Sequence, residues 1–237
     1  MPDSICQICE HKMKIKLQIK GKPIVYACGE CGHNFSKYAG DAIEYHKEFY
    51  RKNPRHQRVK GEFRGGKVTQ KFHRARRRIV SGRMVLVSKY LKKNYSCLDV
   101  GAGAGTFAHK IKDKVNDVEC TELDPSLISE CKRLGFKSYS GDFSNLHFDK
   151  KFDIVFAWHV LEHVRNVKPF LDNMRDISRR LFILEIPVTN LRRKFDGHFH
   201  KFTHKSLEMC LNSSGFKIIE TKSGIQKPAI FAVCEIC

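Results

Sequence analysis

The sequence has no long hydrophobic run. No apolar segment among its 237 residues approaches the roughly 20 residues that a membrane-spanning helix needs. Residues 1–20 also lack the apolar core of a secretory signal peptide. These absences predict a soluble, cytoplasmic chain that does not act at a membrane. The length suits one ordinary α/β domain with a small appendage.

Acidic residues are nearly missing between Arg51 and Lys93. This segment has one acidic residue, Glu62, and 16 lysines and arginines. The rest of this basic protein carries only four of its 19 net positive charges. Because such a density of like charge repels itself, we expect an anionic partner. Apolar residues recur at helical spacing from Lys67 to Leu91 and predict a long helix. The expected contacts are three adjacent arginines in its middle: Arg76, Arg77 and Arg78.

The sequence leaves the nature of that anionic partner open. It could be RNA or DNA, a nucleotide-sugar or an anionic glycan, and phosphate contacts in particular make affinity depend strongly on salt. A solvated helix that only adds solubility is the alternative interpretation. No aromatic platform of the kind that stacks RNA bases accompanies the basic segment. Its charge alone therefore does not choose among these partners.

The chain has ten cysteines, and in a cytoplasmic protein these predict metal binding rather than disulfides. Two Cys-x2-Cys pairs with 18 residues between them supply four ligands: Cys6, Cys9, Cys28 and Cys31. Two such knuckles complete a tetrahedral zinc site. Residues 1–40 hold too few apolar side chains for a core of their own, so one structural zinc ion (Zn2+) would supply most of their folding free energy. Iron in the same four-thiolate site is the alternative.

The other cysteines are not expected to bind metal. Cys234 and Cys237 follow an apolar segment, 228–233, that reads as the last strand of a sheet. A redox pair normally opens a helix, so two unligated thiols are expected here. Four more cysteines lie on apolar faces of expected elements and read as small core residues: Cys97, Cys120, Cys131 and Cys210.

A glycine-rich turn follows the apolar segment 96–100. Its glycines occupy alternate positions and precede an amphipathic stretch: Gly101, Gly103 and Gly105. A strand, a turn without Cβ atoms and a helix N-terminus bring backbone amides close to a nucleotide-like ligand. A second expected strand, 118–124, ends in an acid 19 residues after Gly105, where a ribose hydroxyl would be bound. Further short strands end near Ser140 and Trp158.

These motifs together resemble those of the class I S-adenosylmethionine-dependent methyltransferases over residues 79–237. The matching motifs are Asp99-x-Gly-x-Gly-x-Gly105, Leu123-Asp-Pro-Ser126, Gly141-Asp-Phe143, Phe152-Asp-Ile-Val155 and Val160-Leu-Glu-His-Val164. The resemblance implies an α/β fold with a Rossmann-like seven-stranded sheet and helices on both faces. A preceding zinc ribbon is similar to an arrangement in sugar-modifying methyltransferases. We therefore expect a zinc ribbon at 1–40, a basic helical linker at 41–78 and the methyltransferase domain at 79–237.

The resemblance also implies roles at the cofactor site. Asp99 would orient the turn near the methionine amino group, and the three glycines would allow close backbone approach. Asp124 is expected to bind the ribose diol, with Glu122 as the alternative. Asp142 would accept a hydrogen bond from the adenine amino group, and Phe143 would lie against the ring.

The expected acceptor side is the segment that follows the fourth strand. His163 would act as a general base because its intrinsic pKa lies near neutrality, and Glu162 would orient it. Some related quinone O-methyltransferases hold a divalent metal here but have Glu where this chain has His159, which weakens a metal role for His159. The alternative is a Glu-His pair that caps the next helix. After the fifth strand, His200 would contact the acceptor and Thr203 would cap a helix.

The function implied is S-adenosylmethionine-dependent methyl transfer to a small or glycan-type, anionic acceptor. A nucleic-acid methyltransferase that holds RNA with the basic segment 51–93 is one alternative. The other is a catalytically inactive methyltransferase-like protein that binds RNA or serves in assembly. Intact glycines and cofactor acids favour an enzyme over this second alternative.

Overall fold

The computed structural model describes residues 4–20, 22–37, 70–188, 198–226 and 228–237. The greater part of the expected linker, 41–69, and the basic loop around 189–197 lie outside these residues, as do the side chains of 70–76, Arg76 included. The boundaries expected at residues 40 and 78 stay predictions. Two sheets are present in the described part, one of five strands and one of seven.

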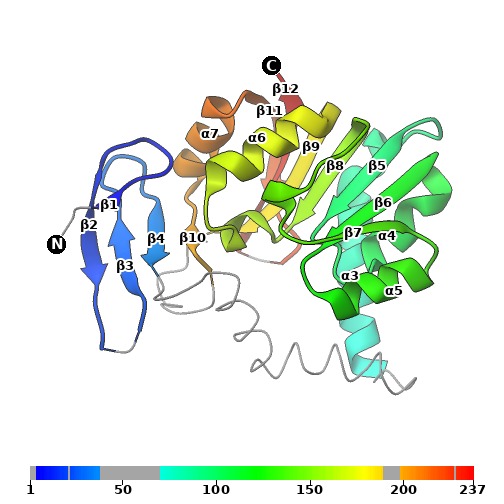
Figure 1. The fold of residues 1–237 in the computed structure, drawn as a ribbon, viewed down its shortest axis with the longest axis horizontal. Helices are drawn as coiled ribbons and strands as arrows, with labels where there is room; N and C mark the ends of the chain where they lie inside the picture. The colour runs from blue at the N-terminus through cyan, green and yellow to red at the C-terminus, as the bar shows by residue number, and fades with distance from the viewer. Residues whose placement is uncertain (1–3, 21, 38–69, 189–197, 227) are drawn as a thin grey trace.

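The seven-stranded sheet forms the centre of the molecule, with strand order β11-β12-β9-β8-β5-β6-β7 (Figure 1). Its strands are β5 (Ser96–Val100), β6 (Asp117–Glu122), β7 (Lys137–Ser140), β8 (Phe152–Trp158), β9 (Ser178–Pro187), β11 (Phe216–Ser223) and β12 (Ala229–Ile236). Strands β5 to β9 are parallel, and β12 runs antiparallel to both β9 and β11. The expected seven-stranded Rossmann-like sheet is confirmed.

Helices cover both faces of this sheet because its strands are apolar on both sides. The helices are α3 (Gln70–Val87), α4 (Thr106–Ile111), α5 (Pro125–Arg133), α6 (Val167–Ile177) and α7 (His204–Ser213), with short 3-10 turns η1 (Ser88–Tyr90), η2 (Lys112–Lys114), η3 (Phe143–Asn145) and η4 (Leu161–His163). Buried residues of α3, α4 and α5 share one core with Cys97 and Phe156. Those of α6 and α7 share the other with Leu98 and Ala157. Alternate residues of one strand thus enter opposite cores.

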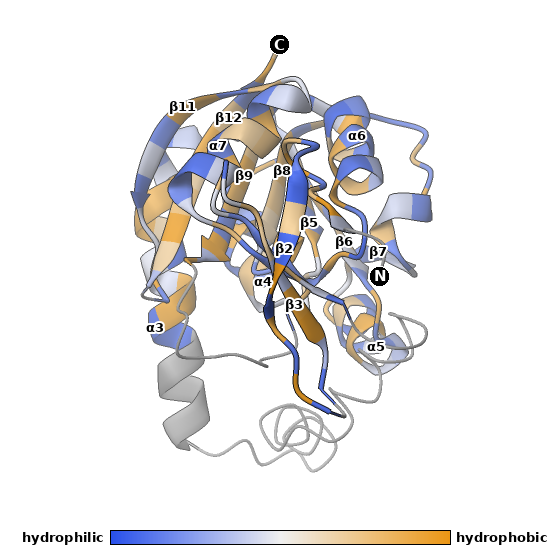
Figure 2. Ribbon diagram, turned by 90° about the vertical axis from the view of Figure 1, so that its left-hand side faces the viewer, coloured by the Kyte–Doolittle hydropathy of each residue, from blue (hydrophilic) through white to orange (hydrophobic). Residues whose placement is uncertain are grey.

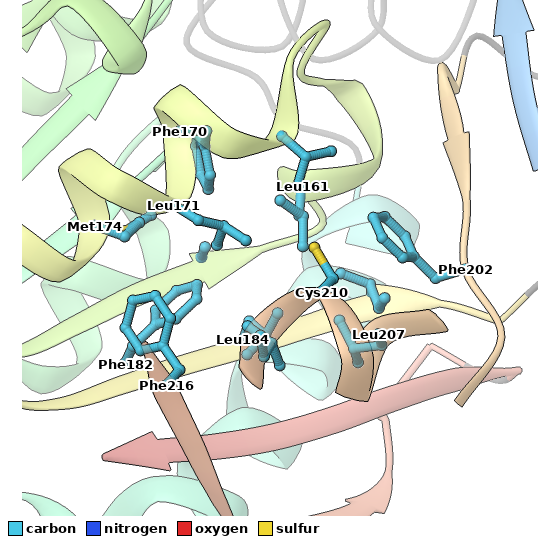
Figure 3. Close-up of a cluster of buried hydrophobic side chains, with 14 of the residues drawn as sticks. Leu161, Phe170, Leu171, Met174, Phe182, Leu184, Phe202, Leu207, Cys210 and Phe216 are labelled. Atoms are coloured by element: carbon cyan, nitrogen blue, oxygen red, sulfur yellow. The ribbon is translucent and has the colours of Figure 1, made fainter. Parts of the chain in front are cut away.

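Helix α6 shows why these segments are helical. Its buried residues recur three or four positions apart and form one apolar stripe: Val167, Phe170, Leu171, Met174 and Ile177. Figure 3 shows this stripe facing Phe182 and Leu184 of the sheet, beside Cys210 of α7. The rest of α6 is hydrophilic (Figure 2). Truncating a buried ring such as Phe170 to Ala would cost about 3–5 kcal/mol.

The smaller sheet combines N-terminal strands with one strand from the far end of the chain. Its order is β1 (Ser4–Ile5), β2 (Lys12–Leu17), β3 (Ile24–Ala27), β4 (Asn34–Lys37) and β10 (His200–Lys201). Strand β10 pairs antiparallel with β4, with His200 opposite Phe35. The N-terminal strands therefore lie next to the segment that enters α7 (Figure 1). No helix in the described ranges has the length and apolar character needed to span a membrane.

Candidate active site

The glycine turn lies where the strand order of the large sheet reverses, between β5 and β8. The chain proceeds from β5 outward to β7 and then returns to β8 on the other side of β5. In open parallel sheets, ligands bind at the carboxyl ends of the strands at such a point. Gly101 has φ +66° there, and a Cβ atom on it would lie 2.6 Å from Cγ2 of Val160. Glycine is needed at this position for both conformation and space.

A carboxylate at the end of β6 binds the glycine turn directly. Oε2 of Glu122 accepts a hydrogen bond from Gly103 N at 2.8 Å, and Oε1 accepts bonds from the amides of Leu123 and Asp124. Burial raises the pKa of Glu122 despite these donors. Asp124 instead caps α5, with Oδ1 accepting from Ser126 N at 2.9 Å. Glu122 thus contacts the glycine turn and Asp124 caps α5, and the expected ribose contact of either acid stays a prediction.

Asp99 lies under the turn with its side chain buried. It is 1% exposed, and neither carboxylate oxygen has a hydrogen-bond partner among the described residues. Burial raises its pKa to about 7, although the nearby Arg83 guanidinium acts in the opposite direction. A buried, unpaired carboxylate of this kind suits a cationic group of a ligand, such as an ammonium.

Sequence patterns did not identify Arg83 as a site residue. Helix α3 places its guanidinium 4.6 Å above the Trp158 ring, and Nη2 lies 3.8 Å from Glu185 Oε1. Its Nε atom is buried without a hydrogen-bond partner in the described part of the chain. In sequence, Arg83 is one of the 16 basic residues of the segment 51–93. Only packing against the sheet distinguishes it from exposed Arg78.

Asp142 and Phe143 occupy structural positions at the end of β7. Oδ1 of Asp142 accepts from Ser144 N at 3.0 Å and caps η3. The Phe143 ring is 6% exposed, and its centroid lies 5.1 Å from that of Phe170. Their expected contacts with adenine stay predictions.

His159 bridges two buried carboxylates at the end of β8. Nδ1 lies 3.2 Å from Glu162 Oε1, and Nε2 lies 2.8 Å from Glu185 Oε1. Burial alone would lower the pKa of His159, but the two carboxylates raise it to about 9. His159 also has φ +58°, a conformation unusual outside glycine and common at functional sites. At neutral pH it is therefore an imidazolium that holds both carboxylates in place.

Glu162 lies closer to His159 than to His163, and its expected role in orienting His163 stays a prediction. His163 Nε2 lies 3.9 Å from Glu162 Oε1, beyond hydrogen-bond distance, and Glu162 Oε2 is buried with no hydrogen-bond partner in the described ranges. The His163 ring contacts the His198 ring edge-on at 4.6 Å. Glu162, His163 and His198 offer ligand atoms within 4.8 Å of one another, a donor set that suits a divalent metal. Sequence analysis did not identify His198 as a site residue, because only the folded chain brings it close to His163.

The four N-terminal cysteines converge as their spacing predicts. Their sulfur atoms lie within 4.8 Å of one another, with Cys6 and Cys31 3.6 Å apart and Cys9 and Cys28 3.4 Å apart. Tetrahedral zinc with Zn–S bonds of about 2.3 Å places sulfurs about 3.8 Å apart, so the donor set fits the ion. Although partial burial opposes it, the Cys31 amide and the Cys9 thiol lower the pKa of Cys28 to about 7. Burial raises the pKa of Cys6 to about 11 and also raises that of Cys31, so a bound metal would have to displace their protons.

His200 belongs to β10 of the smaller sheet and has no exposed surface. Nδ1 is 3.0 Å from His33 Nε2, and Nε2 is 3.3 Å from the Arg165 carbonyl oxygen. Burial lowers its pKa to about 4, so it is neutral at pH 7. Its expected contact with the acceptor stays a prediction, and an acceptor would reach it only if one of these hydrogen bonds opened. Thr203 caps α7 as expected.

The expected basic helix is formed, and α3 runs unbroken from Gln70 to Val87. Arg77 and Arg78 are exposed on it. Contact of these arginines, and of Arg76, with a substrate stays a prediction.

Comparison with known proteins identifies similar folds. The family model described as methyltransferase domain matches residues 72–221. Magnesium protoporphyrin IX methyltransferase from Synechocystis PCC 6803 with bound SAH is 14% identical, with a TM-score of 0.64 over 83% of this chain and 100% of that chain. The same enzyme with bound SAM gives 16% identity, a TM-score of 0.63 and coverage of 85% and 100%.

A second similar structure is an S-adenosylmethionine-dependent methyltransferase from Clostridium acetobutylicum. It is 12% identical, with a TM-score of 0.57 over 68% of this chain and 91% of that chain. No curated protein matches the chain in sequence. At these identities the solved structures show a shared fold, whereas the family model spans more than half of the chain.

Proposed function

Since this chain belongs to the class I S-adenosylmethionine-dependent methyltransferases, we propose that it methylates a small or glycan-type acceptor that carries negative charge. The observation that carries the anionic acceptor is the net charge of +19, concentrated in residues 51–93. The limited exposure of the acceptor-side residues favours a small group over a nucleic-acid duplex. Glu162 is fully buried there, and the side chains of His159 and His163 are each 21% exposed.

Glu122, Asp99 and the glycine turn would hold the cofactor. The bound cofactor supplies an activated methyl group on a sulfonium. Glu122 accepts two hydrogen bonds at Oε1 and one from the turn at Oε2, so Oε2 has one lone pair left for a ribose hydroxyl. The buried Asp99, whose carboxylate oxygens make no hydrogen bond within the described residues, suits the methionine ammonium.

The acceptor-side residues would place the nucleophile in line and remove its proton. His159 is unsuited to the base role because its two carboxylate partners keep it protonated, with a pKa of about 9. We assign the base to His163, whose imidazole is partly exposed and lies 3.9 Å from Glu162 Oε1. The four cysteines are proposed to hold one structural zinc ion.

Transfer of a labelled methyl group tests this proposal. Wild-type protein is incubated with labelled S-adenosylmethionine and either anionic glycans, nucleotide-sugars or RNA, while calorimetry measures cofactor binding. We expect a measurable heat of S-adenosylmethionine binding and transfer of the labelled methyl group to a glycan or nucleotide-sugar. The His163→Ala variant should lose methyl transfer and keep the heat of cofactor binding. Label in RNA alone would contradict the acceptor class. Absence of cofactor heat in the wild type would contradict the enzyme and favour a binding protein on this fold.

RNA methylation is the second candidate because Arg77 and Arg78 are exposed side by side in α3. A phosphate-binding helix of this kind needs exposed, adjacent cations. The same labelling experiment separates the two acceptor classes.

A further inference from the structure

The first cysteine knuckle caps a helix of the large domain. Gln7 lies between the two ligands of this knuckle, and its Nε2 donates to the Arg165 carbonyl at 3.2 Å. Its Oε1 accepts from Val167 N at 3.1 Å. Val167 is the first residue of α6, and the helix's own N-cap, Asn166, makes no side-chain cap bond. Gln7 therefore satisfies an amide that the helix leaves open.

The second cysteine knuckle also forms hydrogen bonds with the start of a helix, α7. The carbonyl oxygen of Cys31 accepts from Oγ1 of Thr203, the N-cap of α7, at 2.9 Å. Lys205 in the first turn donates to the Glu30 carbonyl at 2.5 Å. Gly32 packs so closely that a Cβ atom on it would lie 3.1 Å from Thr203 Cγ2. The two knuckles thus hold the N-termini of the two helices that cover the same face of the sheet.

A buried histidine pair joins these two contacts. His33 and His200 are both fully buried, and their rings stack with centroids 5.1 Å apart. His33 Nδ1 lies 3.7 Å from Cys6 Sγ, and its carbonyl accepts from the Cys28 amide at 2.9 Å. His33 thus contacts a ligand of each knuckle. Nε2 of His200 lies within hydrogen-bond distance of the Arg165 carbonyl oxygen, to which Gln7 also donates a hydrogen bond.

The backbone of Phe199 links the small sheet to the candidate catalytic segment. Its amide donates to the Glu162 carbonyl at 3.0 Å, and its carbonyl accepts from Ser36 N at 2.8 Å. Movement of the small sheet would therefore shift Glu162 directly.

We infer that the four-cysteine site is a positioning device for the acceptor side: its two knuckles fix the starts of α6 and α7 and the Glu162–Arg165 segment. Gln7, His33 and Thr203 are positioning residues, since they act through other groups. This inference rests on the proposed function only in assigning that segment to the acceptor. Metal binding at the cysteines then orders the acceptor side, while the glycine turn and Glu122 keep their own contacts.

Hydrogen exchange on the full chain tests the coupling without any substrate. The zinc-loaded protein is compared with protein stripped by a chelator and with protein reloaded with zinc. Removal should accelerate amide exchange at least about tenfold in peptides that cover 163–170 and 199–207. Peptides that cover 99–108 and 118–124 should change less than about twofold, and reloading should restore the slow rates. Unchanged exchange at α6 and α7, or equal acceleration everywhere, would overturn the inference.

A single substitution distinguishes the effect of the Gln7 hydrogen bonds to α6 from the effect of metal binding. Gln7→Ala should accelerate exchange at the start of α6 while zinc content and cofactor affinity stay at wild-type values. Gln7→Glu, which keeps an acceptor for Val167 N, should recover part of the protection. Gln18→Ala is the matched control, because Gln18 is exposed outside the knuckles. Wild-type exchange in Gln7→Ala would contradict the positioning role.

Kinetics give the functional readout once an acceptor is identified. Gln7→Ala should raise KM for the acceptor at least about threefold and leave KM for S-adenosylmethionine unchanged. A rise in both constants, or in neither, would contradict the inference. Missing cofactor heat in zinc-loaded wild type would instead refute the proposed function, and the exchange result would remain valid by itself.

Discussion

At the residue scale, the cofactor side of the described site contains two carboxylates whose environments differ. The Asp99 carboxylate oxygens are buried with no hydrogen-bond partner in the described ranges, and burial raises the pKa of Asp99 to about 7. Glu122 accepts three backbone hydrogen bonds, two at Oε1 and one at Oε2, which compensate part of the cost of burial. Asp99 therefore binds a proton or a cation in the neutral range, whereas Glu122 favours hydroxyl donors.

Asp99→Asn should make the stability of the protein less dependent on pH. The pKa of Asp99 is about 7 in the folded protein against 3.8 for an ordinary aspartate. Between these values the folded state binds more protons than the unfolded state, so stability falls as pH rises through this window. The contribution reaches at most about 4 kcal/mol. Urea unfolding at pH 5 and pH 8 measures it, and an equal pH dependence in wild type and Asp99→Asn would contradict the buried-carboxylate assignment.

Glu122→Ala should weaken S-adenosylmethionine binding about 10–100-fold, the range expected for a lost charged hydrogen bond. Asp124→Ala is the control, because Asp124 caps α5. It should cost about 1 kcal/mol of stability and change cofactor affinity less than about threefold. Calorimetry and urea unfolding measure both quantities. The reverse order of the two affinities would restore Asp124 as the ribose residue.

At the element scale, the glycine turn and η4 are packed together. The Gly101 backbone lies against the Val160 side chain, and Val160 directly precedes η4, which carries Glu162 and His163. The cofactor side and the acceptor side thus meet where the Val160 side chain packs on the glycine turn. A change in this contact should affect both sides.

Gly101→Ala should lower stability by about 2–4 kcal/mol, from a left-handed φ and from the clash with Val160. Gly135→Ala separates the two effects, because Gly135 has φ +87° and open space around its Cβ position. That control should cost only about 1–2 kcal/mol. Adding Val160→Ala to Gly101→Ala should recover part of the clash energy in urea unfolding. No recovery would indicate that φ alone causes the loss.

At the scale of the whole molecule, the net charge bears on binding partners, whereas the topology bears on how the two sheets are connected. The net charge of +19 concerns association with anions and says little about the fold. The two sheets are connected through β10, whose residues follow most of the chain in sequence. The N-terminal strands consequently depend on a segment from the large domain to complete their sheet.

Neutralising two arginines of α3 should reduce the salt dependence of polyanion binding. For single-stranded RNA, each lost phosphate contact lowers the slope of log K against log salt by about 0.7. Arg77→Gln with Arg78→Gln is compared with Lys112→Gln with Lys114→Gln, an exposed pair near η2. Binding is measured by fluorescence anisotropy at several salt concentrations. Equal slopes in the two double variants would show that α3 is not the contact.

Local pattern was sufficient to predict much of the fold and part of the site. The motifs that resemble class I methyltransferases predicted the central sheet, and the two cysteine pairs predicted a four-sulfur cluster. The preference for Asp124 over Glu122 came from motif position, and the fold gives Asp124 a helix cap instead. The pairing of His159 with Glu162 was also not predicted, because it requires the left-handed turn at His159.

Local sequence properties specify the elements of the large sheet and the cysteine cluster, because strand and helix periods, glycine conformations and Cys-x2-Cys spacing act over short stretches of chain. Only the tertiary structure decided which of the many charged residues enter the site. Arg83 meets Glu185 across about a hundred residues, and Gln7 meets Val167 across 160 positions. Such contacts depend on how sheets and helices pack, and no short-range period encodes them. The same holds for the pairing of His33 with His200, through which the cysteine cluster reaches the acceptor side.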